Sequence, residues 1–160
     1  MEKDPNLVEV KIGALIMDPN TNTPIVVLKG VESETVLPIW VGAFEANAIA
    51  LEIEKVVPQR PMTHDLLRNV IIECRLLASS VIITDLLENT FYAKIQLVDQ
   101  NDDAVSFDAR PSDAIALALR LDCPIFVEQK VIDLSASTTA TEAPVEETST
   151  QTDDWPELID

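Results

Sequence analysis

Basic residues are scarce in this chain of 160 residues. It has 11 Lys and Arg against 28 Asp and Glu, which leaves a formal net charge of −17. Such a chain repels the phosphate backbone of nucleic acids at long range, so it lacks the electrostatic footprint of a typical nucleic-acid-binding protein. Contact with RNA or DNA therefore requires a local basic cleft or divalent cations.

Long apolar runs are also missing, since no stretch approaches the roughly 20 residues that span a bilayer. The first residues, MEKDPNLVEV, lack the basic and then apolar pattern of a signal peptide. These two absences predict a cytoplasmic protein that does not contact membranes.

Cysteine and histidine are rare as well. Cys74 and Cys123 lie in apolar segments without CxxC or Cys/His spacing. We predict reduced thiols in the core rather than a disulfide or a structural zinc site. His64 is the single histidine, which makes it the one imidazole available for acid–base chemistry near neutral pH.

The C-terminal part of the chain differs in composition from the rest. Residues 135–160 are rich in Thr, Glu, Ser and Pro, and they contain no Lys or Arg. They bury too little apolar surface to offset the entropy of ordering, which predicts a disordered acidic tail behind one folded domain of residues 1–134. Residues 153–160, DDWPELID, are either a docking motif for a protein partner or part of a solubilising tail.

Short apolar segments of strand and helix type alternate along the body. The expected strands are Val8–Met17, Pro24–Lys29, Thr35–Val41, Val81–Leu86, Thr90–Val98, Ala104–Phe107 and Pro124–Val127. The expected helices are Glu45–Lys55, a helix with its N-cap at Thr63 and an apolar stripe ending at Leu77, and a helix from the N-cap Ser112 to about Leu121. Hairpin turns outnumber crossovers, which predicts an α+β fold of mostly antiparallel sheets with packed helices.

A faint internal repeat accompanies this pattern. The residues AIAL occur at Ala48–Leu51 and again at Ala114–Leu117, each time after strands and a strand-to-helix turn. The match fits an internal duplication of a strand-rich unit plus a helix. It also fits chance in two Ala-rich helices.

Polar residues gather at the three predicted helix starts. The first group contains Gly42, Glu45 and Asn47; the second is RPMTHD at residues 60–65; the third contains Asp108, Arg110, Ser112 and Asp113. Carboxylates are favoured in first helical turns, and each arginine precedes a proline, so every one of these residues can simply stabilise a turn.

The same residues also form the parts of a hydrolytic site. His64, next to Asp65, is a candidate general base. Asp108 and Asp113, together with Glu45, offer oxygen ligands for Mg²⁺ or Mn²⁺, and Arg60 and Arg110 can hold a phosphate. No DxD, HExxH, Walker or GxSxG motif compels catalysis.

Four segments resemble the bifunctional nuclease domain family. They are LPIWVGAFEANAIA at 37–50, RPMTHDLL at 60–67, TFYAKI at 90–95 and DARPSDAIALALR at 108–120. The resemblance covers about residues 7–134 and implies a compact α+β domain that forms a homodimer and cleaves RNA and DNA. The residues on the family's motif positions are Glu45, Arg60, Thr63, His64, Asp65, Asp108, Arg110, Ser112 and Asp113.

The leading hypothesis is a metal-assisted nuclease acting on single-stranded or flexible nucleic acid. In it His64 is the base, Asp108 and Asp113 hold the metal or orient water, Arg60 and Arg110 bind the phosphate, and Glu45 and Asp65 support catalysis. Two alternatives stay open. One is a non-catalytic, dimeric ligand- or protein-binding module with a docking tail, and the other is a sensor of small anions.

Overall fold

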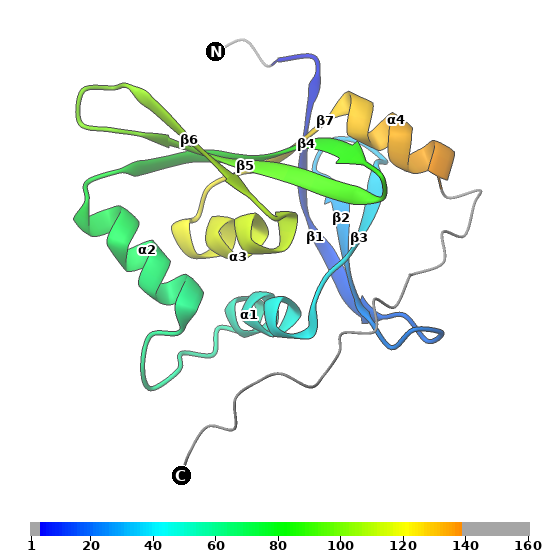
Figure 1. The fold of residues 1–160 in the computed structure, drawn as a ribbon, viewed down its shortest axis with the longest axis horizontal. Helices are drawn as coiled ribbons and strands as arrows, with labels where there is room; N and C mark the ends of the chain where they lie inside the picture. Colours follow the sequence, from blue (N-terminus) through cyan, green and yellow to red (C-terminus); the bar gives the residue numbers. More distant parts are fainter. Residues whose placement is uncertain (1–3, 139–160) are drawn as a thin grey trace.

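The fold is taken from a computed structural model that describes residues 4–138. Its strands are β1 (Leu7–Met17), β2 (Pro24–Gly30), β3 (Val36–Trp40), β4 (Leu77–Leu87), β5 (Thr90–Val98), β6 (Ala104–Ala109) and β7 (Ile125–Glu128). Its helices are α1 (Ala43–Ile53), α2 (Thr63–Glu73), α3 (Pro111–Leu121) and α4 (Gln129–Thr138). The predicted α+β class is confirmed (Figure 1).

Over the described residues, all the strands join in one sheet of order β3-β2-β1-β7-β4-β5-β6. Every neighbouring pair is antiparallel except β4 and β7, which are parallel. The short strand β7 therefore connects two antiparallel meanders, β1–β2–β3 and β4–β5–β6. The strands of the first meander run steeply across those of the second, so the sheet is strongly twisted (Figure 1).

The two halves repeat the same arrangement of three antiparallel strands followed by a helix, α1 in the first half and α3 in the second. The four-residue sequence match is out of register with it, however. Ala48 lies six residues beyond the N-cap Gly42, whereas Ala114 lies four residues beyond the N-cap Arg110. Counted from the helix starts, Ala48 is equivalent to Ala116.

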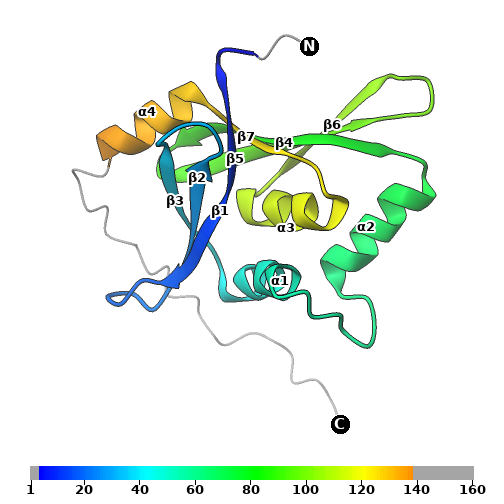
Figure 2. The same cartoon turned by 180° about the vertical axis from the view of Figure 1, so that it is seen from behind.

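Helix α3 lies at the centre of the helical layer. It packs between α1 and α2 and against β4 and β5, and α4 covers β4 and β7 from the other side (Figures 1 and 2). The helix is Ala- and Leu-rich because most of its surface is buried. The residues of α3 that are at most 2% exposed are Ala114, Ile115, Ala116, Leu117 and Ala118. Within residues 4–138 no helix has the length and hydropathy that crossing a membrane requires.

The region after α2 differs from the sequence prediction. The helix ends at Glu73, Arg75 has a φ of 58°, and Leu77 begins β4 instead of closing the helical stripe. Of the predicted apolar stripe only Ile71 is buried. Cys74 is exposed, so its assignment to the core was wrong, whereas Cys123 is half-buried. Sequence periodicity identified an apolar face but not what covers it.

The folded domain extends beyond the predicted boundary at residue 134. Helix α4 continues to Thr138, and Ser135 is buried. Val131 of this helix is fully buried, which anchors the helix on the sheet. The rest of the predicted tail, including residues 153–160, lies outside the described residues.

Each of the first three helices carries an acid at its third position: Glu45 in α1, Asp65 in α2 and Asp113 in α3. The predicted side-chain caps were wrong. Thr63 is the first helical residue after the N-cap Met62, and Ser112 follows Arg110 and the N1 proline Pro111, whose φ suits a helix start. In α2, Asp65 Oδ2 accepts a hydrogen bond from the N–H of Met62 at 3.0 Å.

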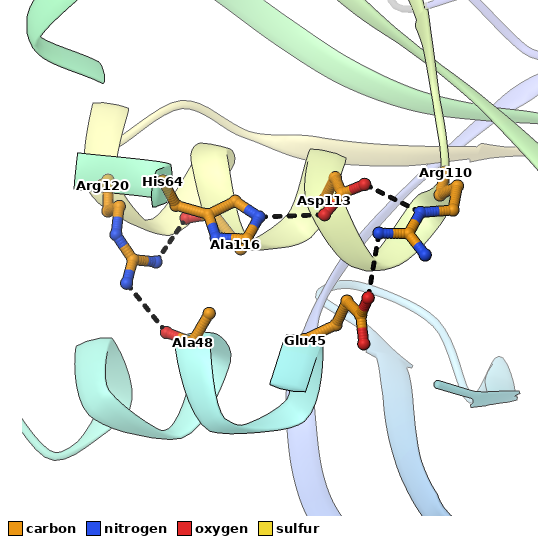
Figure 3. Close-up of polar contacts among 7 residues, drawn as sticks. All are labelled: Glu45, Ala48, His64, Arg110, Asp113, Ala116 and Arg120. Atoms are coloured by element: carbon orange, nitrogen blue, oxygen red, sulfur yellow. Dashed lines mark hydrogen bonds and ion pairs between the residues drawn. The ribbon is translucent and has the colours of Figure 1, made fainter. Parts of the chain in front are cut away.

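A buried arginine in the last turn of α3 connects the three helices. The side chain of Arg120 is 3% exposed, and its Nε donates to Asp65 Oδ1 in α2 at 2.8 Å. Its two terminal nitrogens donate to the carbonyl oxygens of Ala116 in α3 and Ala48 in α1, at 2.9 and 3.0 Å (Figure 3). One guanidinium therefore fixes the relative positions of α1, α2 and α3.

We expect Asp65→Ala to destabilise the fold by about 3–5 kcal/mol, because it leaves the buried guanidinium of Arg120 without a counter-charge. Urea unfolding measures the loss. The matched control is Glu73→Ala, which removes an exposed carboxylate from the same helix and should change stability by less than about 0.5 kcal/mol. Equal effects of the two substitutions would contradict the role assigned to Arg120.

Candidate functional site

The first turns of α1, α2 and α3 meet in a continuous polar network. Arg110, the N-cap of α3, donates from Nη2 to Glu45 Oε1 and from Nε to Asp113 Oδ2, both at 2.9 Å. The other oxygen of Asp113, Oδ1, lies 2.9 Å from Nε2 of His64. The order of contacts is Glu45, Arg110, Asp113, His64 (Figure 3).

The environment keeps two members of this network, Asp113 and Arg110, charged. Burial opposes ionisation of Asp113, but the hydrogen bonds from Arg110 and His64 outweigh it and hold the pKa of the carboxyl below its usual value. The pKa of Arg110 is raised, chiefly by its hydrogen bond to Asp113. At neutral pH the pair is a carboxylate and a guanidinium.

This charge state fixes the role of the imidazole nitrogens. An ionised carboxylate only accepts hydrogen bonds, so the Nε2 of His64 must carry the proton that it shares with Asp113. In the neutral ring, Nδ1 then holds the free lone pair. No other side chain in residues 4–138 hydrogen-bonds to this imidazole, whose side chain is 14% exposed. His64 is thus oriented by Asp113 and has one nitrogen available for proton transfer.

The network forms part of the wall of a cavity of about 960 Å³ between α1, α2, α3 and the strands β5 and β6. Most of its wall is apolar. The apolar lining residues include Phe44, Met62, Leu67, Val70, Ile71, Leu76, Ile95, Leu97, Phe107 and Leu117. Ligand cavities of proteins share this size and this combination of an apolar wall with a few convergent polar groups.

The structure brings together only part of the predicted site. Glu45, His64, Arg110 and Asp113 share one network and line the cavity. Asp65 is next to His64 in sequence, but its oxygens bind the N–H of Met62 and the Nε of Arg120. Burial opposes the effect of these bonds, which still hold the pKa of Asp65 below its usual value. Asp65 therefore serves the helix packing.

Arg60 and Asp108 lie apart from the network. Arg60 is exposed in the segment before α2 and is not among the residues that line the cavity. Asp108 lies at the cavity rim, opposite Lys94 in the β5–β6 ladder. Alternation along β6 points its side chain away from the face that carries Phe107. In residues 4–138 no hydrogen bond or ion pair joins either side chain to the network.

The predicted site for a divalent cation is not assembled from three or more ligands in the described residues. Among the described residues no three His, Cys, Asp or Glu side chains gather in a way that holds a metal. Both oxygens of Asp113 are already engaged, by His64 and by Arg110. The Mg²⁺ or Mn²⁺ site at Asp108 and Asp113 stays a prediction from the sequence.

Sequence reasoning missed Arg120 and the aromatic side chains of the cavity. Arg120 interrupts the run ALALRLD, and an arginine on the buried face of an apolar helix needs a partner. That signal was present in the sequence. Phe44 and Phe107 gave no comparable signal, because single apolar residues are common in strands and helices.

The fold and the network define an α+β protein with a histidine–aspartate pair and an arginine in the wall of a mostly apolar cavity. Comparison with known proteins adds the family. The family model of the bifunctional nuclease domain matches residues 26–140, and the chain belongs to this family. This assignment agrees with the resemblance seen in the four sequence segments.

Curated relatives come from Mycobacterium tuberculosis. The uncharacterized proteins MT1877, from strain CDC 1551 / Oshkosh, and Rv1829, from strain ATCC 25618 / H37Rv, are each 42% identical to this chain over 124 residues. The alignment covers 78% of this chain and 73% of each relative. Their names state no activity. The predicted homodimer and the predicted cytoplasmic location stay predictions.

The lowered pKa values of Asp65 and Asp113 predict acid sensitivity. Each carboxyl binds protons less readily in the folded state, so its contribution to stability is complete above the unfolded-state pKa of about 3.9. That contribution is lost as the pH falls from there through the folded-state pKa. Asp113→Asn should make the fall shallower, as measured by urea unfolding at a series of pH values below about 5. Parallel profiles for the wild type and the variant would contradict this linkage.

Proposed function

We propose that this protein hydrolyses phosphodiester bonds in RNA or DNA at the His64–Asp113–Arg110 network. The observation that carries the proposal is the pairing of an oriented imidazole with an exposed guanidinium through one carboxylate. The Arg110 side chain is 65% exposed, so it can contact a substrate while its Nε and Nη2 hold the network. Membership of the bifunctional nuclease domain family supports the same reaction class.

The network offers a phosphate one exposed guanidinium and the starts of three helices, although two carboxylates lie beside them. The network is built from the first turns of α1, α2 and α3, where unpaired N–H groups and helix dipoles carry partial positive charge. Arg110 adds a full positive charge at the same place. A phosphate group can therefore be attracted locally, although the net charge of −17 disfavours long stretches of nucleic-acid backbone.

The chemistry follows from the hydrogen-bond network. Nδ1 of His64 takes a proton from water, whose oxygen attacks phosphorus while the bond to the leaving oxygen breaks. The imidazolium then gives the proton to the leaving oxygen. Asp113 holds the ring in the required tautomer and stabilises the imidazolium, and the free N–H groups of Arg110 bind the charged phosphoryl oxygens.

A non-catalytic binding module is the second candidate function. The observation in its favour is the cavity wall, which is mostly apolar and suits a ligand or a peptide as well as a reaction. Highly purified protein that binds a ligand but cleaves neither RNA nor DNA would select this role over the nuclease.

We expect His64→Ala to lower cleavage of a labelled oligonucleotide at least about 100-fold, because the variant lacks the proposed base. Glu73→Ala is the matched control in the same helix, and it should cleave like the wild type. Because the variants are purified identically, a contaminating nuclease would give equal rates in all three samples. Full activity of His64→Ala would remove this residue from the mechanism.

Substitution of the two predicted phosphate-binding arginines should have different effects on cleavage. Arg110→Ala should reduce kcat/KM about 100-fold, the scale of losing a donor to the transition state. Arg60→Ala should stay within about 2-fold of the wild type, because Arg60 does not line the cavity. Steady-state kinetics on the same oligonucleotide measures both. A large loss in Arg60→Ala alone would place the phosphate outside this network.

A further inference from the structure

Two phenylalanines stand exposed in the cavity beside the network. Aromatic residues make up only 4% of the chain, yet two of its four phenylalanines line this one cavity. Phe44 is 88% exposed in the first turn of α1, and Phe107 is 50% exposed on β6. Large apolar rings that are exposed to solvent beside a candidate site indicate a surface that binds a ligand or a partner.

Both rings belong to the segments that carry the network. Phe44 directly precedes Glu45, and Phe107 lies three residues before Arg110. In the β5–β6 ladder Phe107 is opposite Ile95, which is buried, so Phe107 lies on the sheet face that the helices cover. The apolar wall is therefore continuous with the proposed phosphate site.

The charge of the site limits how a nucleic acid can be held. Apart from His64, the Asp, Glu, Lys and Arg residues that line the cavity are Glu45, Asp108, Asp113, Arg110 and Arg120, so acids outnumber bases. Arg120 is buried and committed to the helices. Only Arg110 offers positive charge to a substrate, which is too little to track the many phosphates of a duplex. Affinity has to come from the bases.

We propose that Phe44 and Phe107 are stacking residues for unpaired bases next to the phosphate held by Arg110, which makes single-stranded nucleic acid the substrate class. This inference rests on the proposed function and identifies its specificity-determining residues. Base stacking on aromatic rings is tolerant of sequence, because every base has a π-face. Bases inside a duplex are stacked on each other and are not available to these rings.

The test measures binding separately from cleavage. Fluorescence anisotropy in the His64→Ala background compares an oligothymidine of about 12 nucleotides, an abasic strand of the same length and charge, and the corresponding duplex. We expect the oligothymidine to bind at least about 10-fold more tightly than the other two. Phe44→Ala and Phe107→Ala should each weaken its binding by about 5-fold to 100-fold and leave the abasic strand unaffected. The dependence on salt should be shallow, because few phosphates are neutralised.

Tyr92→Ala is the matched control. Tyr92 is an aromatic residue on β5, 40% exposed, and it does not line the cavity. The Tyr92→Ala variant should bind the oligothymidine as tightly as the parent protein does. Size-exclusion chromatography of each variant detects the competing explanation, in which the two rings contact a second copy of this chain.

Three results would overturn the inference: equal binding of the oligothymidine and the abasic strand, undiminished binding by both phenylalanine variants, or a change of oligomeric state in place of a change in affinity. Absence of any binding would overturn it as well. Cleavage is measured separately, with proteins that retain His64. A nuclease with unaltered phenylalanine variants refutes only the stacking proposal, and base-dependent binding without cleavage refutes only the nuclease.

Discussion

The buried guanidinium of Arg120 is the interaction on which the rest of this structure depends. It joins a carboxylate of α2 to carbonyl oxygens of α1 and α3, and it does so out of contact with water. A buried charge is costly without partners, so it favours the arrangement of the three helices that supplies these hydrogen bonds. That arrangement brings their first turns together, and the network of His64, Asp113, Arg110 and Glu45 follows from it.

The two arginines of α3 divide structure and function between them. Arg120, at the end of the helix, satisfies internal carbonyls and Asp65. Arg110, at its beginning, is largely exposed, lines the cavity and neutralises two acids. Both pair with acids at the third position of a helix, where a carboxylate is already favoured by the helix dipole. The same local preference thus yields a packing contact in one case and a candidate reaction centre in the other.

Local patterns in the sequence were sufficient for most of the fold. Alternating apolar residues, turn residues and Ala-rich segments predicted each of the first three helices and all of the strands, because these signals act over a few residues. The errors occurred where contacts with residues distant in the sequence determine the structure. The apolar stripe of α2 was predicted to run on to Leu77, but the helix ends at Glu73 and most of its stripe lines a cavity. Helix α4 was missed, and its last four residues, 135–138, were assigned to the tail.

The sequence by itself determined the α+β class, the acidic charge, the family and the presence of polar groups at helix starts. Only the tertiary structure decided which of those groups meet. His64 and Asp113 are 49 positions apart and bonded, whereas Asp65, adjacent to His64, is bonded to Arg120 instead. Asp108 and Arg60 carry suitable chemistry but lie outside the network. Side-chain pairing depends on how distant elements pack, and that packing is encoded by the whole core rather than by any short motif.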